Sequence, residues 1–396
     1  MVLPRFAPPV KACQGLRSGP VSPVRDHPAS GYTAVMSKRI GILTGGGDCP
    51  GLNAVIRSVV LQARGTYGWD VVGIRDGFEG LYEENYLDLS VDKVAHVVSR
   101  GGTMLGSSNR ANPFAYPLKL PDGRVEIHDV SVRCLANLTR LGLEGLIVVG
   151  GDGTMSFSKK FLDKGARIVG VPKTIDNDLQ ATDYTVGFQT AVEVVTEAID
   201  RLHTTAESHE RIMIVEVMGR YAGWIALCSG IAGGAHCVLI PEIEYDIDRV
   251  VESFHLGHGR GVSYSVVVVA EGAKPRGGEL AIVAKGDVTK QEKLGGAGQR
   301  LAEAIMARTD YEVRVTVLGH LQRGGNPCAF DRELAARFGV KAVDLVAEGK
   351  FGHVAALEHG QIVAKPIEQA VKKLKLVDIN GEMVKTARGV GIELGG

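Results

Sequence analysis

The sequence predicts an α/β fold with mostly parallel sheets, and three observations support this fold class. From Arg39 onward, short apolar runs rich in β-branched residues alternate with amphipathic stretches, as in successive βαβ units. The chain has 396 residues, which is enough for two domains at about 150 residues each. Glycine accounts for 52 residues, nearly twice its usual share of roughly 7%, and it gathers in doublets and triplets where the apolar runs end. Such turns let the backbone approach a ligand closely.

The apolar runs are predicted to be strands, and two of the amphipathic stretches that follow them are predicted to be helices. Several runs end in glycine or polar residues, and ligands of open α/β sheets bind beyond the carboxyl ends of strands. These ends therefore form a site hypothesis on their own. The predicted strands are residues 40–43, 71–74, 145–149, 168–171, 212–217, 237–240 and 265–269, and the predicted helices are residues 53–64 and 155–162.

Residues 1–36 differ in composition from the rest of the chain. They are rich in proline and basic residues, and Asp26 is their only acid. A transit peptide is also basic, but the prolines and the scarcity of serine disfavour its amphipathic helix. We expect a disordered N-terminal extension or an upstream start codon, with Met36 as the functional start.

Charge and cysteine usage exclude several classes of protein. The 45 Lys and Arg residues balance 45 Asp and Glu residues, so no net positive field attracts nucleic acid or an acidic membrane. The 6 cysteines include no C-x-x-C pair, which argues against a zinc ribbon or a disulfide framework and favours a cytoplasmic location. No aliphatic run approaches the roughly 20 residues that cross a bilayer.

Two glycine-rich turns follow predicted strands and precede helical patterns. Residues 150–154, Gly-Gly-Asp-Gly-Thr, offer bare amides and a helix N-terminus to phosphate oxygens. Asp152 would suit a polyphosphate only if it held Mg²⁺; otherwise it caps a tight turn. Residues 44–48, Thr-Gly-Gly-Gly-Asp, match neither the Walker pattern nor the full dinucleotide fingerprint, so they are either a ligand contact or a packing turn.

Residues 174–178, Thr-Ile-Asp-Asn-Asp, carry two carboxylates at alternate positions. In an extended segment, Asp176 and Asp178 could lie on one side. One could take a hydroxyl proton while the other helps to order Mg²⁺, although the string is also an ordinary turn sequence. Cationic donors suited to a phosphate monoester, or else ordinary surface residues, are Arg211, Arg314, His320 and Arg323.

Together these strings resemble the 6-phosphofructokinase family, of the A type and its mixed ATP- and pyrophosphate-like subgroup. The resemblance runs from about Arg39 to at least Ile367. One string could match by chance, but all of them in family order could not reasonably do so. The matching strings lie at residues 46–53, 100–107, 150–154, 172–178, 200–202, 215–220, 231–234 and 317–325.

The resemblance implies a role for each matching residue. Asp176 would be the base that takes the proton from the sugar 1-hydroxyl, and Asp152 would hold Mg²⁺ on the phosphoryl donor. The residues implied at the donor are Gly47, Arg110, Gly151, Asp152, Gly153 and Thr154. Those implied around the sugar are Thr174, Ile175, Asp176, Met218, Gly219, Arg220 and Glu271, and those implied at its 6-phosphate are Arg211, Arg314, His320 and Arg323.

Two positions bear on the identity of the donor. ATP-dependent members of the family usually have glycine where Gly153 stands, and pyrophosphate-dependent members have aspartate. At Lys173 the familiar ATP enzymes have glycine, whereas the pyrophosphate enzymes have lysine. We give Gly153 more weight, because a missing side chain leaves room for ATP while a flexible lysine can move aside.

The resemblance also implies the architecture and the reaction. Two doubly wound α/β domains would enclose the active site in the cleft between them. Residues 37–187, completed by about 322–372, would bind the donor, and residues 188–321, completed by about 373–396, would bind the sugar phosphate. The enzyme would phosphorylate fructose 6-phosphate with MgATP, or alternatively and reversibly with pyrophosphate. It would be a homodimer or homotetramer, with Arg211 and Arg314 supplied to the neighbouring subunit.

Two other readings fit parts of the sequence. NAD kinases and lipid kinases share the Gly-Gly-Asp-Gly-Thr turn, but they do not explain residues 174–178, 218–220 and 320–323 together. A catalytically dead subunit that senses sugar phosphate would be expected to have lost Asp152 or Asp176, and both are present. The family's effector site uses several arginines, and none lies between Arg75 and Arg100, so allosteric control by the usual effectors is not assumed.

Overall fold

The computed structural model describes residues 37–108, 112–259, 261, 263–284 and 293–396. The predicted N-terminal extension, with Met36, lies outside the described residues. The described residues from Ser37 onward belong to one compact unit that contains two main sheets. The division into two domains at residue 187 stays a prediction.

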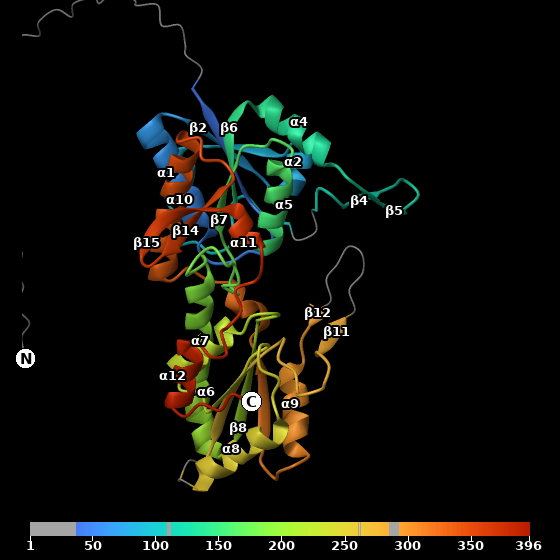
Figure 1. Ribbon diagram of the computed structural model, residues 1–396, viewed down its shortest axis with the longest axis vertical. Coiled ribbons are helices and arrows are strands. Elements are labelled where there is room, and N and C mark those ends of the chain that lie inside the picture. Colours follow the sequence, from blue (N-terminus) through green and yellow to red (C-terminus); the bar gives the residue numbers. More distant parts are fainter. Residues whose placement is uncertain (1–36, 109–111, 260, 262, 285–292) are drawn as a thin grey trace, which may run out of the picture. The chain divides into compact units, whose positions relative to one another are not determined.

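A seven-stranded sheet forms the first half of the fold (Figure 1). Its strands lie in the order β15-β14-β7-β6-β1-β2-β3. The pairs β2–β3 and β14–β15 are antiparallel and the other pairs are parallel, so the carboxyl ends of β1, β6 and β7 meet at one edge. The strands are β1 (Arg39–Thr44), β2 (Asp70–Ile74), β3 (Tyr86–Leu89), β6 (Leu143–Gly150), β7 (Ile168–Pro172), β14 (His353–Glu358) and β15 (Gln361–Pro366).

Helices cover both faces of this sheet because successive strand residues point to opposite faces. Ile40 and Ile42 belong to one core cluster with α1 and α10, whereas Leu43 belongs to another cluster with α4 and α5. Figure 1 shows these two pairs of helices on either side of the strands. The helices are α1 (Leu52–Tyr67), α4 (Ser131–Leu141), α5 (Asp152–Leu162) and α10 (Ala329–Ala347).

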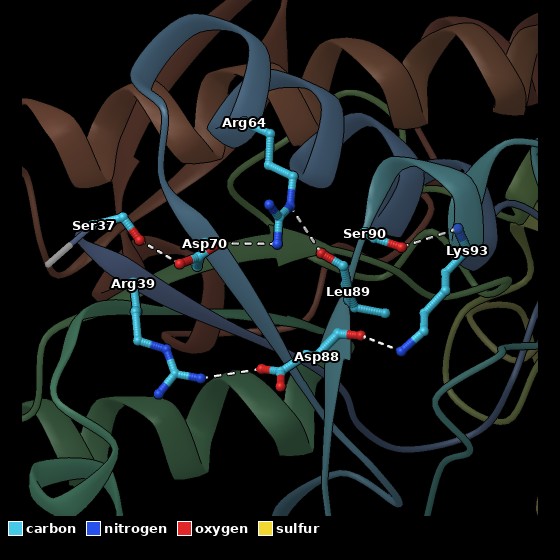
Figure 2. Close-up of polar contacts among 8 residues, drawn as sticks. All are labelled: Ser37, Arg39, Arg64, Asp70, Asp88, Leu89, Ser90 and Lys93. Atoms are coloured by element: carbon cyan, nitrogen blue, oxygen red, sulfur yellow. Dashed lines mark hydrogen bonds and ion pairs between the residues drawn. The ribbon is translucent and has the colours of Figure 1, made fainter. Parts of the chain in front are cut away.

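Polar contacts near the surface hold the edge strand β3 against the rest of the sheet (Figure 2). Arg64 of α1 forms an ion pair with Asp70 and donates to the Leu89 carbonyl, each at 3.0 Å. Arg39 reaches Asp88 on β3, also at 3.0 Å. Exposed pairs of this kind contribute at most about 1 kcal/mol each, so they secure the antiparallel edge strand without dominating stability.

The second sheet is entirely parallel, in the order β13-β8-β10-β9. Val215 and Val268 pack with α6 and α7 on one face, and Ile214 and Val267 pack with α8 and α9 on the other. The strands are β8 (Ile212–Val217), β9 (Cys237–Leu239), β10 (Ser265–Ala270) and β13 (Val313–Val317). The helices are α6 (Phe188–His209), α7 (Trp224–Ala232), α8 (Ile247–Gly259) and α9 (Ala297–Met306).

The end of the chain returns to both sheets. Strands β14 and β15 complete the first sheet, and Glu393 then pairs with Cys237 at the start of β9. The smaller elements are α2 (Phe78–Glu83), α3 (Val91–Val94), β4 (Tyr116–Lys119), β5 (Val125–His128), β11 (Ile282–Ala284), β12 (Lys293–Leu294), the 3₁₀ helix η1 (Gly319–Arg323), α11 (Ile367–Val371) and α12 (Glu382–Gly389).

The α/β fold class is confirmed, and every predicted strand and both predicted helices are present. The sequence pattern did not predict β3, the hairpin β4–β5, β11, β12 and β13 to β15. The four residues of β5, Val-Glu-Ile-His, alternate apolar and polar side chains, but the strand is short and all four residues are exposed. Within the described residues, none of the helices combines the length and apolar character needed to span a membrane.

Candidate active site

Three predicted loops meet where β1, β6 and β7 end. The amide of Gly45 donates to Val149 O at 2.9 Å, and the amide of Lys173 donates to Gly150 O at 3.0 Å. These bonds join each loop to the neighbouring strand end. The structure therefore brings together residues 44–48, 150–154 and 174–178, as expected for adjacent parallel strands.

Packing explains some of the glycines at this edge of the sheet, but not all of them. A Cβ atom on Gly150 would lie 2.3 Å from Thr154 Cγ2, and one on Gly45 would lie 2.8 Å from the same atom, so packing requires both glycines. A Cβ on Gly153 would meet nothing within 4 Å. Packing therefore does not explain Gly153, which borders open space in the first turn of α5.

Asp152 begins α5, beside the free amides of the helix N-terminus. Burial raises the pKa of its carboxyl group, and its charge in turn raises the pKa of Asp178. In the part of the chain that is described, no group of three or more His, Cys, Asp or Glu is arranged to hold a metal ion. A single carboxylate still fits Mg²⁺, because this ion keeps several waters and shares phosphate oxygens of its substrate.

Asp176 and Asp178 form an interacting acidic pair. Burial is the largest effect on Asp176 and raises its pKa; the charge of Arg323 opposes this. Burial and then the charge of Asp176 raise the pKa of Asp178 to about 7. Asn177 between them has a φ of 51°, which is uncommon for a non-glycine residue, and its side-chain oxygen accepts the Thr185 amide.

Thr174 and Ile175 precede this acidic pair. The Thr174 hydroxyl accepts the amide of Asp176 at 3.2 Å, which fixes the turn. Ile175 is fully buried in the main core, so its side chain anchors the segment. Only its backbone is suited to meet a ligand.

The ends of β8 and β10 lie side by side and carry the predicted sugar contacts. The amide of Glu271 donates to Val217 O at 2.8 Å, and the Gly272 amide donates to Gly219 O at 3.1 Å. Burial raises the pKa of Glu271, opposed by the charge of Arg220. The charges of Glu271 and Arg220 also act on Asp176, so the second sheet supplies charged groups to the catalytic candidate of the first.

The 3₁₀ helix η1 joins the two sides of the site. Arg323 Nη1 donates to Asp48 O at 3.2 Å, and a Cβ on Gly47 would lie 2.8 Å from the same nitrogen. Gln322 is fully buried, and its side-chain oxygen accepts the Met218 amide at 3.2 Å. Gln322 therefore links the helix that carries His320 and Arg323 to the end of β8, a role that the sequence analysis missed.

Arg211 and Arg314 lie elsewhere. Both belong to the amino ends of their strands, and the Glu312 carboxylate holds both, with Arg211 Nε at 2.6 Å. About 23 Å of extended chain separates Arg211 from Met218, at roughly 3.3 Å per residue. The structure thus does not bring these two arginines to the other site residues of the same chain.

Lys173 differs from the expectation of a flexible side chain that can move aside. It is 3% exposed, and its Nζ donates to Gly45 O at 3.0 Å and to Gly47 O. Burial lowers the pKa of this amine. These two contacts fix the lysine against the glycine turn. Arg110, also predicted at the donor, lies outside the described residues.

Comparisons with known proteins agree with this geometry. The family model described as phosphofructokinase matches residues 39–346. The ATP-dependent 6-phosphofructokinase 2 of Clostridium perfringens is 49% identical over 360 residues, covering 90% of this chain and 98% of the relative. The pyrophosphate–fructose 6-phosphate 1-phosphotransferase of Streptomyces coelicolor is 52% identical over 342 residues, covering 86% and 96%.

Solved structures support the same fold. Phosphofructokinase from Saccharomyces cerevisiae matches with a TM-score of 0.69 and 30% identity over 85% of this chain. The match spans 45% of the yeast chain, so this chain covers about half of that longer protein. A pyrophosphate-dependent phosphofructokinase from Marinobacter aquaeolei matches with a TM-score of 0.73 at 23% identity, covering 90% and 88%, and shows likeness of fold alone.

Proposed function

Since the chain belongs to the phosphofructokinase family, we propose that it transfers the terminal phosphoryl group of MgATP to the 1-hydroxyl of D-fructose 6-phosphate. The products are fructose 1,6-bisphosphate and ADP. The proposal depends chiefly on the position of Asp176, which lies just beyond the end of β7 in the first sheet. There the charges of Arg323, Glu271 and Arg220 act on its carboxyl group.

The residues divide the work between positioning and charge neutralisation, which phosphoryl transfer mainly requires. Asp176 takes the proton from the attacking hydroxyl, and its raised pKa makes it a stronger base than an exposed carboxylate. Asp152 holds Mg²⁺, which when bound offsets charge on the phosphoryl donor. The amides at the start of α5 receive phosphate oxygens.

The second sheet holds the sugar phosphate. Met218, Gly219, Arg220 and Glu271 orient the sugar, and His320 and Arg323 bind its 6-phosphate. We propose the corresponding domains as residues 37–187 with 322–372 for the donor, and residues 188–321 with 373–396 for the sugar phosphate.

The remaining phosphate-binding residues come from a second subunit. Arg211 and Arg314 are held together by Glu312 at the far end of β8, away from their own chain's site. A homodimer or homotetramer would place this pair at the sugar phosphate of the neighbouring chain. Crosslinking and light scattering measure the assembly, and mixed oligomers of an Arg211→Ala chain with an Asp176→Ser chain test the sharing. Activity regained on mixing supports shared sites; no regain contradicts them.

Pyrophosphate is the second candidate donor, and Lys173 is the observation that favours it. Its ammonium group lies against the Gly45 and Gly47 carbonyls beside the donor turn, and relatives at about 50% identity carry a pyrophosphate-dependent name. Gly153 supports ATP, because the open space beside it leaves room for the rest of a nucleotide.

Initial rates decide between the donors. Formation of fructose 1,6-bisphosphate is measured from fructose 6-phosphate and Mg²⁺, with ATP and pyrophosphate at matched concentrations. A strong preference for ATP supports the proposal and implies a practically irreversible step. Equal or greater activity with pyrophosphate would replace it with a reversible enzyme, in which Lys173 outweighs Gly153.

A further inference from the structure

Thr185 lies 11 residues after Thr174 and contacts the catalytic turn, which we define as residues 174–178. Its hydroxyl donates to the Thr174 carbonyl at 2.6 Å, and its amide donates to Asn177 Oδ1 at 3.1 Å. Thr185 is fully buried, so water does not compete for either hydrogen bond. It therefore clasps the turn at two points, one on each side of Asp176.

Thr174 connects this clasp to both acids of the catalytic turn. Its hydroxyl accepts the amide of Asp176 at 3.2 Å. Burial is the largest effect on the pKa of Asp178 and raises it, while a hydrogen bond with the Thr174 side chain opposes this shift. One hydroxyl thus contacts the backbone of one acid and the carboxyl group of the other. The bond from Thr185 to the Thr174 carbonyl fixes the backbone from which this hydroxyl extends.

The backbone conformation of Asn177 explains the second contact of the clasp. Asn177 has a φ of 51°, which most non-glycine residues avoid. Such a conformation persists where the surrounding contacts determine it. The Asn177 side-chain oxygen accepts the Thr185 amide, and its Nδ2 donates to Asp183 O at 3.3 Å. Segment 183–185 therefore holds the residue between the two acids in this conformation.

The segment that contains Thr185 is itself fixed by its neighbours along the chain. The Val186 amide donates to Pro172 O at 3.2 Å, which joins the segment to the end of β7. The fully buried carboxylate of Asp331 accepts the Gly187 amide at 3.0 Å, which joins the segment to α10. Thr185 is therefore supported by the first sheet and by α10, and it can hold the catalytic turn without moving itself.

We propose that Thr185 is a positioning residue: its hydroxyl fixes the Thr174 carbonyl and so holds the Asp176 carboxylate where it receives the proton of the sugar 1-hydroxyl. A general base must lie within about 2.6–3.2 Å of the hydroxyl, and a misplacement of about 1 Å can cost roughly 100-fold in rate. The effect on turnover rests on the proposed function, whereas the clasp does not. The two parts therefore need separate measurements.

Substitutions at Thr185 separate the hydroxyl from the shape of the side chain. Thr185→Val keeps the branched shape and removes the hydroxyl, so the Thr174 carbonyl loses this donor. Thr185→Ser keeps the hydroxyl and removes the methyl group. Thr185→Ala replaces Thr185→Val if the valine variant does not fold. The matched control is Thr196→Val, because the Thr196 hydroxyl donates to Val192 O at 2.8 Å within α6 and not to the catalytic turn.

Initial rates with ATP and fructose 6-phosphate measure the effect on turnover, at a temperature where melting curves show each variant folded. Thr185→Val should lower kcat by about 10–100-fold and leave KM for both substrates within about twofold, because the groups that bind them are unchanged. Thr185→Ser should keep kcat within about threefold of the wild type, and Thr196→Val should leave it unchanged. Unchanged kcat in Thr185→Val, an equal loss in Thr185→Ser, or a change in KM alone would overturn the positioning role.

Hydrogen exchange, measured by mass spectrometry on the full chain, tests the clasp without any reaction. In Thr185→Val the backbone amides of residues 174–178 should exchange about tenfold faster, whereas in Thr185→Ser and Thr196→Val they should exchange as in the wild type. Equal protection of the turn in all three variants would overturn the clasp. A wild-type chain without kinase activity would contradict the proposed function instead, and hydrogen exchange would still decide the clasp.

Discussion

The donor side of the site is built mainly from backbone groups, whereas the sugar side is built mainly from charged side chains. The donor side consists of backbone at the ends of β1 and β6, where Gly45 and Gly150 pack against Thr154 and Gly153 borders open space in the first turn of α5. The sugar side consists of charged side chains at the ends of β8 and β10 and on η1. Glycine substitutions should therefore separate packing from donor binding, whereas charge substitutions should separate chemistry from sugar binding.

The largest effect should come from Asp176→Ser, which removes the base where the two sides meet. We expect kcat to fall by about 10³–10⁴-fold, while KM for fructose 6-phosphate changes little. Steady-state kinetics and calorimetric binding of fructose 6-phosphate measure the two quantities separately. Unchanged turnover would remove Asp176 as the base, and a loss confined to sugar binding would give it a binding role.

Arg323→Ala should weaken binding of the sugar phosphate without weakening binding of ATP. Loss of a charge-assisted hydrogen bond to the 6-phosphate costs about 1.5–3 kcal/mol, which corresponds to roughly 10–100-fold in KM for fructose 6-phosphate. KM for ATP should stay within about twofold. The control Arg337→Ala, on the exposed surface of α10, should leave both constants unchanged. An effect on ATP affinity alone would contradict the assignment.

On the donor side, a matched pair of glycine substitutions distinguishes packing from ATP binding. Gly150→Ala places a Cβ 2.3 Å from Thr154 Cγ2 and 2.4 Å from Thr154 Cβ, so we expect a loss of about 1–3 kcal/mol in stability. Gly153→Ala meets no atom within 4 Å and should stabilise α5 by about 0.5–1 kcal/mol while raising KM for ATP.

Melting temperatures and ATP kinetics of this pair provide the measurement. A drop in melting temperature for Gly153→Ala would show that packing, and not the donor, requires glycine there. An unchanged KM for ATP would show that the open space is not used by the nucleotide.

The smallest effect concerns the pH dependence of stability through Asp178. Burial raises its pKa in the folded chain to about 7, well above the ordinary value of about 4. The folded state then binds more protons than the unfolded state, so this contribution to stability is present below pH 4 and is lost as the pH rises to about 7. Asp178→Asn should flatten the fall in melting temperature between pH 5 and pH 8.

The exposed Asp92→Asn serves as the control for this pH series. It should leave the slope of melting temperature against pH unchanged. An Asp178→Asn variant that follows the wild-type slope would show that other acids, such as buried Asp331, carry the dependence.

Much of the fold could be predicted because its signals are local. The runs at residues 212–217 and 265–269 are apolar throughout, and both form strands buried along their whole length. The glycine turns 44–48 and 150–154 directly follow the predicted runs at residues 40–43 and 145–149, so the edge of the first sheet that holds the site was also predictable. The strands of the hairpin β4–β5 have four residues each, too few for a clear pattern. Strand β14 contains the buried apolar run Val-Ala-Ala-Leu, but its place in the first sheet depends on pairing with the distant β7.

Periodicity and short motifs depend on neighbours along the chain, so the predicted buried strands and the glycine turns could be read from the sequence alone. The resemblance of these motifs to a family then named Asp176 as the candidate base. Three features came from the folded chain instead: Arg323 reaches Asp48, Lys173 is fixed against glycine carbonyls, and Arg211 lies far from its own site. It also placed Lys375 against Asn177, 198 residues away. The physical reason is that these groups are held by backbone carbonyls and charges from distant segments, which packing of the two sheets brings within bonding distance.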